Sequence, residues 1–356
     1  MAKPTGPANA SIAVDAMGSD LGPGEVIAGV ALVLENLKDP PERFIIVGDE
    51  AVLKNHLEEE GLANHPQIQT YHASEVIQMD EKPLKSLKAK KDSSMVRAIE
   101  LVKEGEAQVV LSCGNTGSLM AGGTLKLRTI PGISRPALGA IIPNQSSHWV
   151  LIDAGANPNP SPENMVGNAI LGKNYCKVAL GIENPRVGLV SIGTEESKGT
   201  DFIVETHELL KKVEEIVNYQ GPIEGTQLFN NTVDVAVCDG FVGNVLLKTC
   251  EGLLETLVNF LKSELTADPV RKIGAFISQG AFKTMKSQLS PERYSGAPLL
   301  GLNGDVLKAH GSSNRHAIEG ALEIATKFIQ QDIDYLIRDD VTRSVALLNG
   351  PVKIQK

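Results

Sequence analysis

Short apolar runs alternate with amphipathic stretches along almost the whole of this 356-residue chain. Such alternation is typical of βαβ units and predicts an α/β fold with a mostly parallel sheet between two layers of helices. The expected strands are Ile12–Asp15, Phe44–Val47, Ile68–His72, Val109–Ser112, Val150–Asp153, Val187–Ile192 and Val235–Asp239, and the expected helices are Gly24–Leu37, Ser94–Glu104, Ser161–Leu180, Asp201–Val213 and Ser313–Ile329.

The sequence contains no Pro/Ser-rich linker and no internal repeat, which favours a single domain over residues 11–345 between flexible tails at 1–10 and 346–356. One segment, about 245–290, departs from the α/β alternation. Apolar residues at helical spacing run from Cys250 to Leu261, and Asp268-Pro269 then breaks the pattern. We expect a helical hairpin inserted into the domain and standing off the sheet.

Charge and cysteine content exclude several classes of protein. The net charge of −9 argues against nucleic acid as a partner, because phosphate backbones require a basic face. The four cysteines show no CxxC spacing, and the polar N-terminus lacks the apolar core of a signal peptide. The seven histidines show no HExxH spacing. We therefore expect a cytoplasmic protein in a reducing compartment, with no metal and no cofactor.

Small polar residues follow several of the expected strands. The stretch "LSCGNTGSLMAGG" (111–123) leaves a buried strand through six small, uncharged residues, and similar loops occur at 14–20, 191–201, 238–244 and 308–314, with a sixth candidate at 152–160. Glycines let a ligand approach the backbone, and helix N-termini present unpaired N–H groups to anions. Ligands of parallel sheets bind beyond the carboxyl ends of the strands, so these loops together predict a cradle for phosphate or another small oxyanion.

The residues expected to line this cradle are Asp15, Gly18, Gly114, Asn115, Thr116, Gly117, Gly193, Thr194, Gly240, Gly243, Ser312, Ser313 and Asn314. No GxGxxG follows the first strand and no GxxxxGK[ST] occurs, which disfavours a standard dinucleotide site or a P-loop.

Several segments, in order along the chain, carry a resemblance to a known family. They include "IAVDAMGSD", "HASEVIQMDEKP", "CGNTGSLMAGG", "NPRVGLVSIGTEESKGTD", "DGFVGNVLLKTCEG" and "YSGAPLLGLNGDVLKAHGSSN". From about Ile12 to about Ile329 the chain resembles the bacterial acyl-ACP:phosphate acyltransferases (PlsX). The resemblance implies transfer of a fatty acyl group from acyl carrier protein to inorganic phosphate for phospholipid synthesis. It also implies a three-layer α/β/α fold similar to isopropylmalate dehydrogenase and phosphotransacetylase, a homodimer, and a membrane glycerol-phosphate acyltransferase as downstream partner.

The chain departs from the family pattern at small residues. Cys113 and Ser118 stand in a loop that usually reads "SAGNTGA", and Ser19 and Ser295 replace glycines. These changes preserve small size. The loop "DAGANPNPSPEN" differs more from the family's pattern, so that acyl chain length or partner contacts can differ there.

Direct attack by phosphate on a thioester needs positioning and oxyanion stabilisation rather than a covalent enzyme nucleophile. Lys198 is the first candidate to neutralise phosphate or the oxyanion, and His310 is a candidate to protonate the departing sulfur or to bind phosphate. Asn244 and Asp239 complete the catalytic candidates, although Asp239, like Asp15, carries a charge that repels phosphate. The alternative for each is a structural role in its loop.

Two basic groups suggest contact surfaces. The first, Lys82, Lys85, Lys88, Lys90, Lys91 and Arg97, suits the acidic acyl carrier protein or is a solvated helix face. The second lies on the hairpin beside the apolar residues Ile273, Phe276, Ile277 and Phe282. That tip either touches a membrane peripherally or packs in a dimer interface.

Three other functions remain open. A phosphotransacetylase acting on a CoA thioester shares the reaction type and fold but needs no acidic protein donor. A metal- and NAD-dependent hydroxyacid dehydrogenase requires grouped carboxylates, which the chain lacks in sequence. A non-catalytic phosphate- or lipid-binding protein is the third. A cysteine mechanism through Cys113 is disfavoured, because no histidine lies near it in sequence.

Overall fold

The computed structural model describes residues 10–144, 147–289 and 296–349. In these residues the chain forms an eleven-stranded sheet with the order β3-β2-β1-β4-β11-β10-β5-β6-β9-β7-β8. The strands are β1 (Ser11–Asp15), β2 (Arg43–Gly48), β3 (Ile68–His72), β4 (Val109–Ser112), β5 (Ala137–Pro143), β6 (His148–Ile152), β7 (Val187–Val190), β8 (Tyr219–Ile223), β9 (Val235–Val237), β10 (Ala297–Leu300) and β11 (Asp305–Lys308). The predicted α/β fold class is confirmed.

The sheet consists of two parallel blocks that run in opposite directions. The first block is β3-β2-β1-β4-β11 and the second is β6-β9-β7-β8. Between them, β10 and β5 form antiparallel ladders with their neighbours. Because there are three antiparallel ladders in succession, the carboxyl ends of the strands lie at opposite edges of the sheet in the two blocks.

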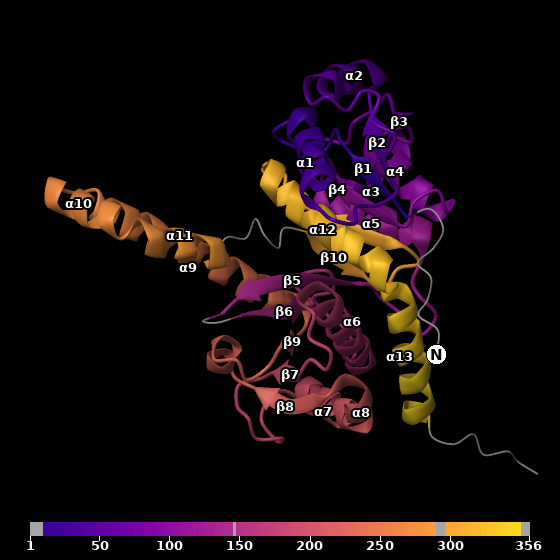
Figure 1. Ribbon diagram of the computed structural model, residues 1–356. Coiled ribbons are helices and arrows are strands. Elements are labelled where there is room, and N and C mark those ends of the chain that lie inside the picture. The colour runs from indigo at the N-terminus through magenta and orange to yellow at the C-terminus, as the bar shows by residue number, and fades with distance from the viewer. Residues whose placement is uncertain (1–9, 145–146, 290–295, 350–356) are drawn as a thin grey trace, which may run out of the picture.

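Helices cover both faces of this sheet (Figure 1). They are α1 (Pro23–Asn36), α2 (Glu50–Glu59), α3 (Pro83–Ala89), α4 (Ser94–Lys103), α5 (Thr116–Leu127), α6 (Pro162–Leu180), α7 (Asp201–Lys212), α8 (Glu214–Val217), α9 (Gly240–Leu265), α10 (Pro269–Ile277), α11 (Gln279–Leu289), α12 (Arg315–Gln331) and α13 (Ile333–Asn349), with a 3₁₀ turn at Gly225–Phe229. Successive residues of β1 show the layering. Ile12 and Val14 pack with α1 and α12, whereas Ala13 between them packs with α4 on the other face.

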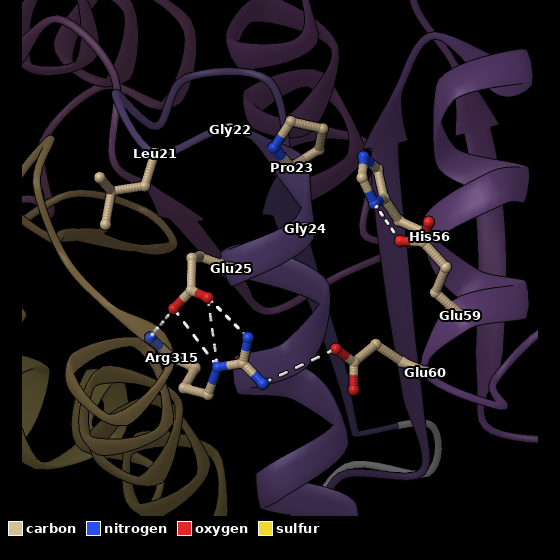
Figure 2. A pocket seen from close by; sticks show the side chains of 9 residues that line it. All are labelled: Leu21, Gly22, Pro23, Gly24, Glu25, His56, Glu59, Glu60 and Arg315. Atoms are coloured by element: carbon tan, nitrogen blue, oxygen red, sulfur yellow. Dashed lines mark hydrogen bonds and ion pairs between the residues drawn. The ribbon is translucent and has the colours of Figure 1, made fainter.

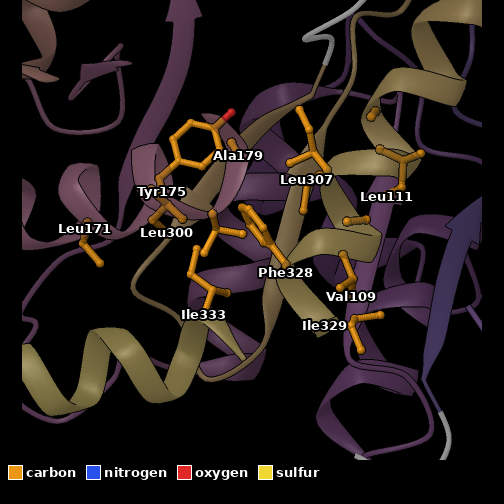
Figure 3. Close-up of a cluster of buried hydrophobic side chains, with 14 of the residues drawn as sticks. Val109, Leu111, Leu171, Tyr175, Ala179, Leu300, Leu307, Phe328, Ile329 and Ile333 are labelled. Carbon is orange, nitrogen blue, oxygen red and sulfur yellow. The ribbon is translucent and has the colours of Figure 1, made fainter. Parts of the chain in front are cut away.

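The largest buried cluster extends along one face of both blocks. Figure 3 shows its middle, where Tyr175 of α6 meets Phe328 of α12. The two rings are fully buried, and they pack edge to face with centroids 5.8 Å apart. This contact joins a helix of the second block to the helix that follows β11 in the first. The core therefore holds the two blocks together.

Capping residues in the sequence mark where several helices begin. Ser161 caps α6 in a capping box with Asn164, and Pro162 takes the first helical position, as predicted. Helix α12 begins at Arg315, two residues later than expected, because Asn314 is its N-cap. Asp239 does not end β9, which stops at Val237. It is instead the N-cap of α9.

Helices α9 to α11 project from the body of the molecule as the predicted insertion (Figure 1). The break falls at Asp268, which caps α10, and Pro269 is that helix's first residue. The hairpin exposes large apolar side chains along its length: Phe241, Val245, Leu253, Leu257 and Phe260 on α9, and Val270, Ile273, Phe276 and Ile277 on α10. Among the described residues, no helix combines the length and hydropathy required to cross a bilayer.

Four strands and several helices were not predicted from the sequence. Strands β5, β8 and β10 each contain proline, and β11 has only two apolar residues, so none shows a clear strand pattern. Helix α13 buries Ile333, Ile337 and Val341 on one face. It continues through residues 346–349, which we expected to be tail. Residues 1–9 and 350–356 of the expected tails lie outside the described part.

Candidate functional site

The loops after β1, β4 and β11 meet at one edge of the first block and form what we call the switch-point group. Strands β2 and β3 lie on one side of β1, and the chain then crosses to β4 on the other, which is where open α/β sheets bind ligands. The loops touch closely: a Cβ on Gly18 would lie 2.8 Å from the Gly114 Cα. The Asp20 N–H donates to the Gly311 carbonyl at 2.9 Å. Of the predicted residues, Asp15, Gly18, Gly114–Gly117, His310 and Ser312–Asn314 belong here.

Helix α5 begins within this group. Asn115 is its N-cap, accepting from the Ser118 N–H at 2.9 Å, and its own amide donates to three carbonyls of residues 78, 79 and 81. The N–H groups of Thr116 and Gly117, at the first two helical positions, have no hydrogen-bond partner among the described residues. Asn115 therefore builds the loop, and the two free N–H groups can receive an anion.

The loop after β11 is closed by its own hydrogen bonds. His310 is exposed, its Nδ1 lies 2.8 Å from the Ser312 Oγ, and it accepts the Ser312 N–H at 3.2 Å. Ser313 is buried and donates its N–H to the His310 carbonyl. The Asn314 side chain accepts from the Ala317 N–H at 3.0 Å. His310 is thus the exposed titratable side chain of this loop.

The acidic and sulfur groups of the switch-point group are buried. Asp15 is 1% exposed and accepts the Ser112 hydroxyl at 2.6 Å. Burial raises the pKa of Asp15, against the hydrogen bond from Ser112. Burial also raises the pKa of Cys113 to about 12, which favours the thiol over the nucleophilic thiolate. Lys308 donates to the carbonyls of Cys113 and Ala309, and burial lowers its pKa.

The loops after β7 and β9 form a second set, the Lys198 group, at the carboxyl edge of the second block. Lys198 is half exposed, and its ammonium lies 3.0 Å from Glu195 of the same loop. Exposed pairs of this kind are weak, so the lysine is free to turn toward an anion. The Lys198 side chain passes close to Gly193, where a Cβ would lie 2.3 Å from the Lys198 Cδ. Thr194 lies exposed beside it.

The N-terminus of α9 supplies the rest of this group. Asp239 accepts the N–H groups of Phe241 and Val242, both at 2.9 Å, so its carboxylate serves as a helix cap, the structural role left open in the sequence. Gly240 packs against the Asn157 backbone, and a Cβ on Gly243 would lie 1.9 Å from the Asp153 carbonyl oxygen. These contacts seat the helix on the loop after β6 and leave Asn244 exposed beside Gly155.

The two groups do not meet within one chain. Five strand steps separate β4 from β9, which is roughly 24 Å along the sheet, and the two blocks present opposite carboxyl edges. The expectation that all the predicted loops share one cradle is therefore not met in a single chain. Antiparallel strands β10 and β5, both absent from the sequence prediction, cause the separation.

Buried Asp153 is a structural residue that the candidate list omitted. Its carboxylate accepts the N–H groups of Leu138, Gly155, Ala156 and Asn157 at 2.7–3.1 Å, and so fixes the loop on which α9 rests. The sequence held a signal for it, because "IDAGANPNP" was recognised as a sixth candidate loop.

A pocket of about 290 Å³ lies beside the switch-point group, at the start of α1 (Figure 2). Arg315 fills one side and is held by Glu25 at 2.6 Å and by Glu60 at 3.8 Å. His56 pairs with Glu59 at 2.9 Å. Three carboxylates line the pocket, and two of them pair with its one arginine, so the pocket repels phosphate and is not the predicted cradle.

Comparisons with known proteins identify the family. A family profile described as "Fatty acid synthesis protein" matches residues 10–335. The phosphate acyltransferase of Halothermothrix orenii is 40% identical over 334 residues, which cover 93% of this chain and 98% of the relative. That of Brevibacillus brevis is 41% identical over 335 residues, covering 94% and 98%. The chain belongs to the phosphate acyltransferase family. The resemblance found in the sequence is confirmed.

Membership of the phosphate acyltransferases makes this chain an acyltransferase that acts in fatty acid and phospholipid synthesis, with phosphate as acyl acceptor. Solved structures bear out the fold. A phosphotransacetylase from Streptococcus pyogenes superposes with a TM-score of 0.58 at 21% identity, covering 89% of this chain and 93% of that one. A branched-chain phosphotransacylase from Enterococcus faecalis gives 0.51 at 15% identity, covering 90% and 99%.

Proposed function

We propose that this phosphate acyltransferase takes a long-chain acyl group from acyl carrier protein and transfers it to inorganic phosphate, giving acyl phosphate for phosphatidic acid synthesis. The observation that carries the proposal is the family relationship over almost the whole chain. The alternative, a phosphotransacetylase acting on a CoA thioester, rests on fold likeness alone. The two differ in the donor that they accept.

Helix α3 offers the surface for an acidic donor. Lys82, Lys85, Lys88 and Lys91 are exposed, and no ion pair of theirs is found among the described residues. Lys90 and Arg97, which we counted in the same basic group, are instead paired with Glu81 and Asp92. Four unpaired lysines around one short helix favour encounter with a strongly acidic protein.

This docking face adjoins the switch-point group. A Cβ on Gly117 would lie 2.6 Å from the Pro83 side chain, so α3 and the start of α5 are in contact. We assign the glycine loops of the switch-point group to binding an anionic part of the substrates, through the free N–H groups of Thr116 and Gly117. His310, on the neighbouring loop, is the candidate side chain to hydrogen-bond that anion.

We place the reaction centre at the Lys198 group. Lys198 and Asn244 are exposed polar side chains that do not hold the fold together. Both are therefore available to bind a substrate. A phosphate oxygen attacks the thioester carbon, the C–S bond breaks, and the pantetheine sulfur leaves as thiolate. Lys198 neutralises the charge that develops on the oxyanion, and Asn244 donates a hydrogen bond to it. Asp239 contributes by orienting the start of α9.

The projecting hairpin provides the surface for dimer assembly and for delivery of acyl phosphate at the membrane. Ile273, Phe276 and Ile277 are 62–78% exposed, and Phe282 is half-buried. An exposed apolar surface of this extent marks a site of contact with another protein chain or with a membrane. We propose that the stems of two hairpins pair in a homodimer, and that the tips touch the membrane peripherally. Acyl phosphate then passes to a membrane-bound glycerol-phosphate acyltransferase, while the enzyme is otherwise cytoplasmic, with no cofactor and no nucleic acid partner.

The decisive experiment measures phosphate-dependent release of free thiol from palmitoyl-ACP, beside palmitoyl-CoA and acetyl-CoA. We expect release from the ACP donor, lost by about 10²-fold or more in Lys198→Ala and retained in Lys212→Ala, an exposed lysine of α7. Release from acetyl-CoA alone would assign a phosphotransacetylase. A normal rate in Lys198→Ala together with a lost rate in His310→Ala would move the reaction centre to the switch-point group.

A further inference from the structure

Three metal-ligand side chains converge where the loop that carries Lys198 meets helix α7. Glu196 belongs to the loop, and His207 and Glu208 belong to the helix. One ligand atom of each residue lies within 4.8 Å of the ligand atoms of the other two. Among the described residues, this is the one such group of three histidine, cysteine or carboxylate side chains.

His207 distinguishes this cluster from an ordinary acidic surface. The residue is 2% exposed, and its Nδ1 lies 2.9 Å from the hydroxyl of Tyr219 on β8. Its Nε2 is buried without a hydrogen-bond partner among the described residues, and the Glu196 carboxylate lies 3.6 Å away. A buried ring nitrogen without a partner costs free energy, and a ligand on Nε2 would remove that cost.

We propose that Glu196, His207 and Glu208 bind one divalent transition-metal ion of the zinc type, with water in the remaining position. Metal–ligand bonds of about 2.0–2.2 Å at tetrahedral angles place ligand atoms about 3.3 Å apart, close to the spacing of His207 Nε2 and Glu196. An imidazole ligand favours zinc and its neighbours over magnesium and calcium, which prefer oxygen ligands alone.

Tyr219 supports this assignment as an outer partner of the ligand. Metal-binding histidines generally use the second ring nitrogen in a hydrogen bond that fixes the tautomer and the orientation of the ring. When the Nδ1–H of His207 donates to the Tyr219 oxygen, Nε2 carries the lone pair that a metal requires. The half-buried phenol holds the imidazole so that Nε2 points toward Glu196.

Lys211 forms an ion pair with the carboxylate of Glu196. Its ammonium lies 3.2 and 3.4 Å from the two oxygens of Glu196. The lysine side chain is 42% exposed, so it can swing into water when a cation of higher charge takes its place. Exchange of Lys211 for a metal would pin the loop of residues 191–200 to α7.

This site departs from the expectation of a protein without metal, which rested on sequence spacing. The ligands combine a loop residue with two adjacent helical residues, a pattern that matches no sequence motif for a metal. The proposal concerns binding alone and does not depend on the identity of the acyl donor.

The test is a calorimetric titration of chelator-treated protein with Zn²⁺, repeated with Co²⁺ and read by visible absorption. The parent and all variants carry Cys250→Ser, so that this partly exposed free thiol does not contribute to the binding signal. We expect one site per chain, weakened by about tenfold or more in His207→Ala and in Glu208→Gln. His316→Ala removes an exposed histidine beside Glu319, at 3.3 Å, and is expected to bind as the parent does.

Each outcome decides the proposal. Glu208→Gln is an exposed, nearly isosteric change, so it keeps the test valid where His207→Ala fails to fold. Weaker binding in both ligand variants with an intense tetrahedral Co²⁺ spectrum in the parent supports the site. Equal affinity in the parent and Glu208→Gln, or no stoichiometric binding in the parent, overturns it.

Discussion

Gly243 offers a sharp test of how the proposed reaction centre is built. A methyl group at this position would stand 1.9 Å from the Asp153 carbonyl oxygen, whereas a methyl group at Gly252, on the same helix, would meet nothing within 4 Å. Replacing Gly243 by alanine therefore requires the start of α9 or the loop after β6 to move by more than about 1 Å, since the peptide oxygen cannot rotate away.

The two alanine variants are expected to change stability in opposite directions. Alanine in place of a helical glycine stabilises by about 0.5–1 kcal/mol, and this is the whole effect at Gly252. At Gly243 a packing cost of about 1–3 kcal/mol opposes that gain. The free energy of unfolding, measured in urea at one fixed protein concentration, should thus be lower in Gly243→Ala than in Gly252→Ala by about 1–3 kcal/mol.

Activity gives a second measure of the same displacement. Asn244 directly follows Gly243, so a shift of about 1 Å should reduce kcat by about 10²-fold with little change in KM. Gly252→Ala should retain the parental kcat. Equal stability of the two variants would refute the packing argument, and a stable but inactive Gly252→Ala would show that α9 acts through another part of its length.

Two further predictions concern stability. Phe328→Ala removes the edge-to-face partner of Tyr175 in the core that joins the two blocks, and should lower the free energy of unfolding in urea by about 3–5 kcal/mol; a loss below about 1 kcal/mol would contradict the buried placement. Burial acts to raise the pKa of Asp234, but the hydrogen bonds and charge of Arg186 outweigh it and leave that pKa below its ordinary value of 3.8. Its stabilising contribution is therefore present above the unfolded pKa of 3.8 and is lost as the pH falls from there through the folded pKa, so the unfolding free energy of Asp234→Asn should depend less steeply on pH below about pH 4 than that of the parent.

Sequence patterns were most informative where a residue acts on its chain neighbours. The cap of α6 at Ser161, the break at Asp268 and the buried strand β1 each follow from a short run of residues. Periodicity failed where strands are short or contain proline. Strand β8 includes Gly221 and Pro222, and β11 is recognisable only because β4 and β10 pair with it.

The candidate site shows the same division. The sequence identified the loops rich in glycine and small polar residues, and within them the capping residues Asn115 and Asp239. It left open which of these groups serve the fold. The hydrogen bonds of Asn115 to three distant carbonyls, and of Asp239 to the first turn of α9, decide that they do.

By itself, the sequence determined the α/β class, the inserted hairpin, the glycine-rich and polar composition of the loops, and the family. Each of these depends on residues close together in the chain or on similarity along it. The tertiary structure decided that the loops fall into two groups, and it brought His207 beside Glu196. The contact of His207 with Glu196 depends on how the loop after β7 folds against α7. The division of the loops depends instead on strand order and direction, which are set by pairings such as β10 with β5 between segments more than 150 residues apart. Only the folded sheet fixes such pairings, because register and direction are selected by burial on both faces.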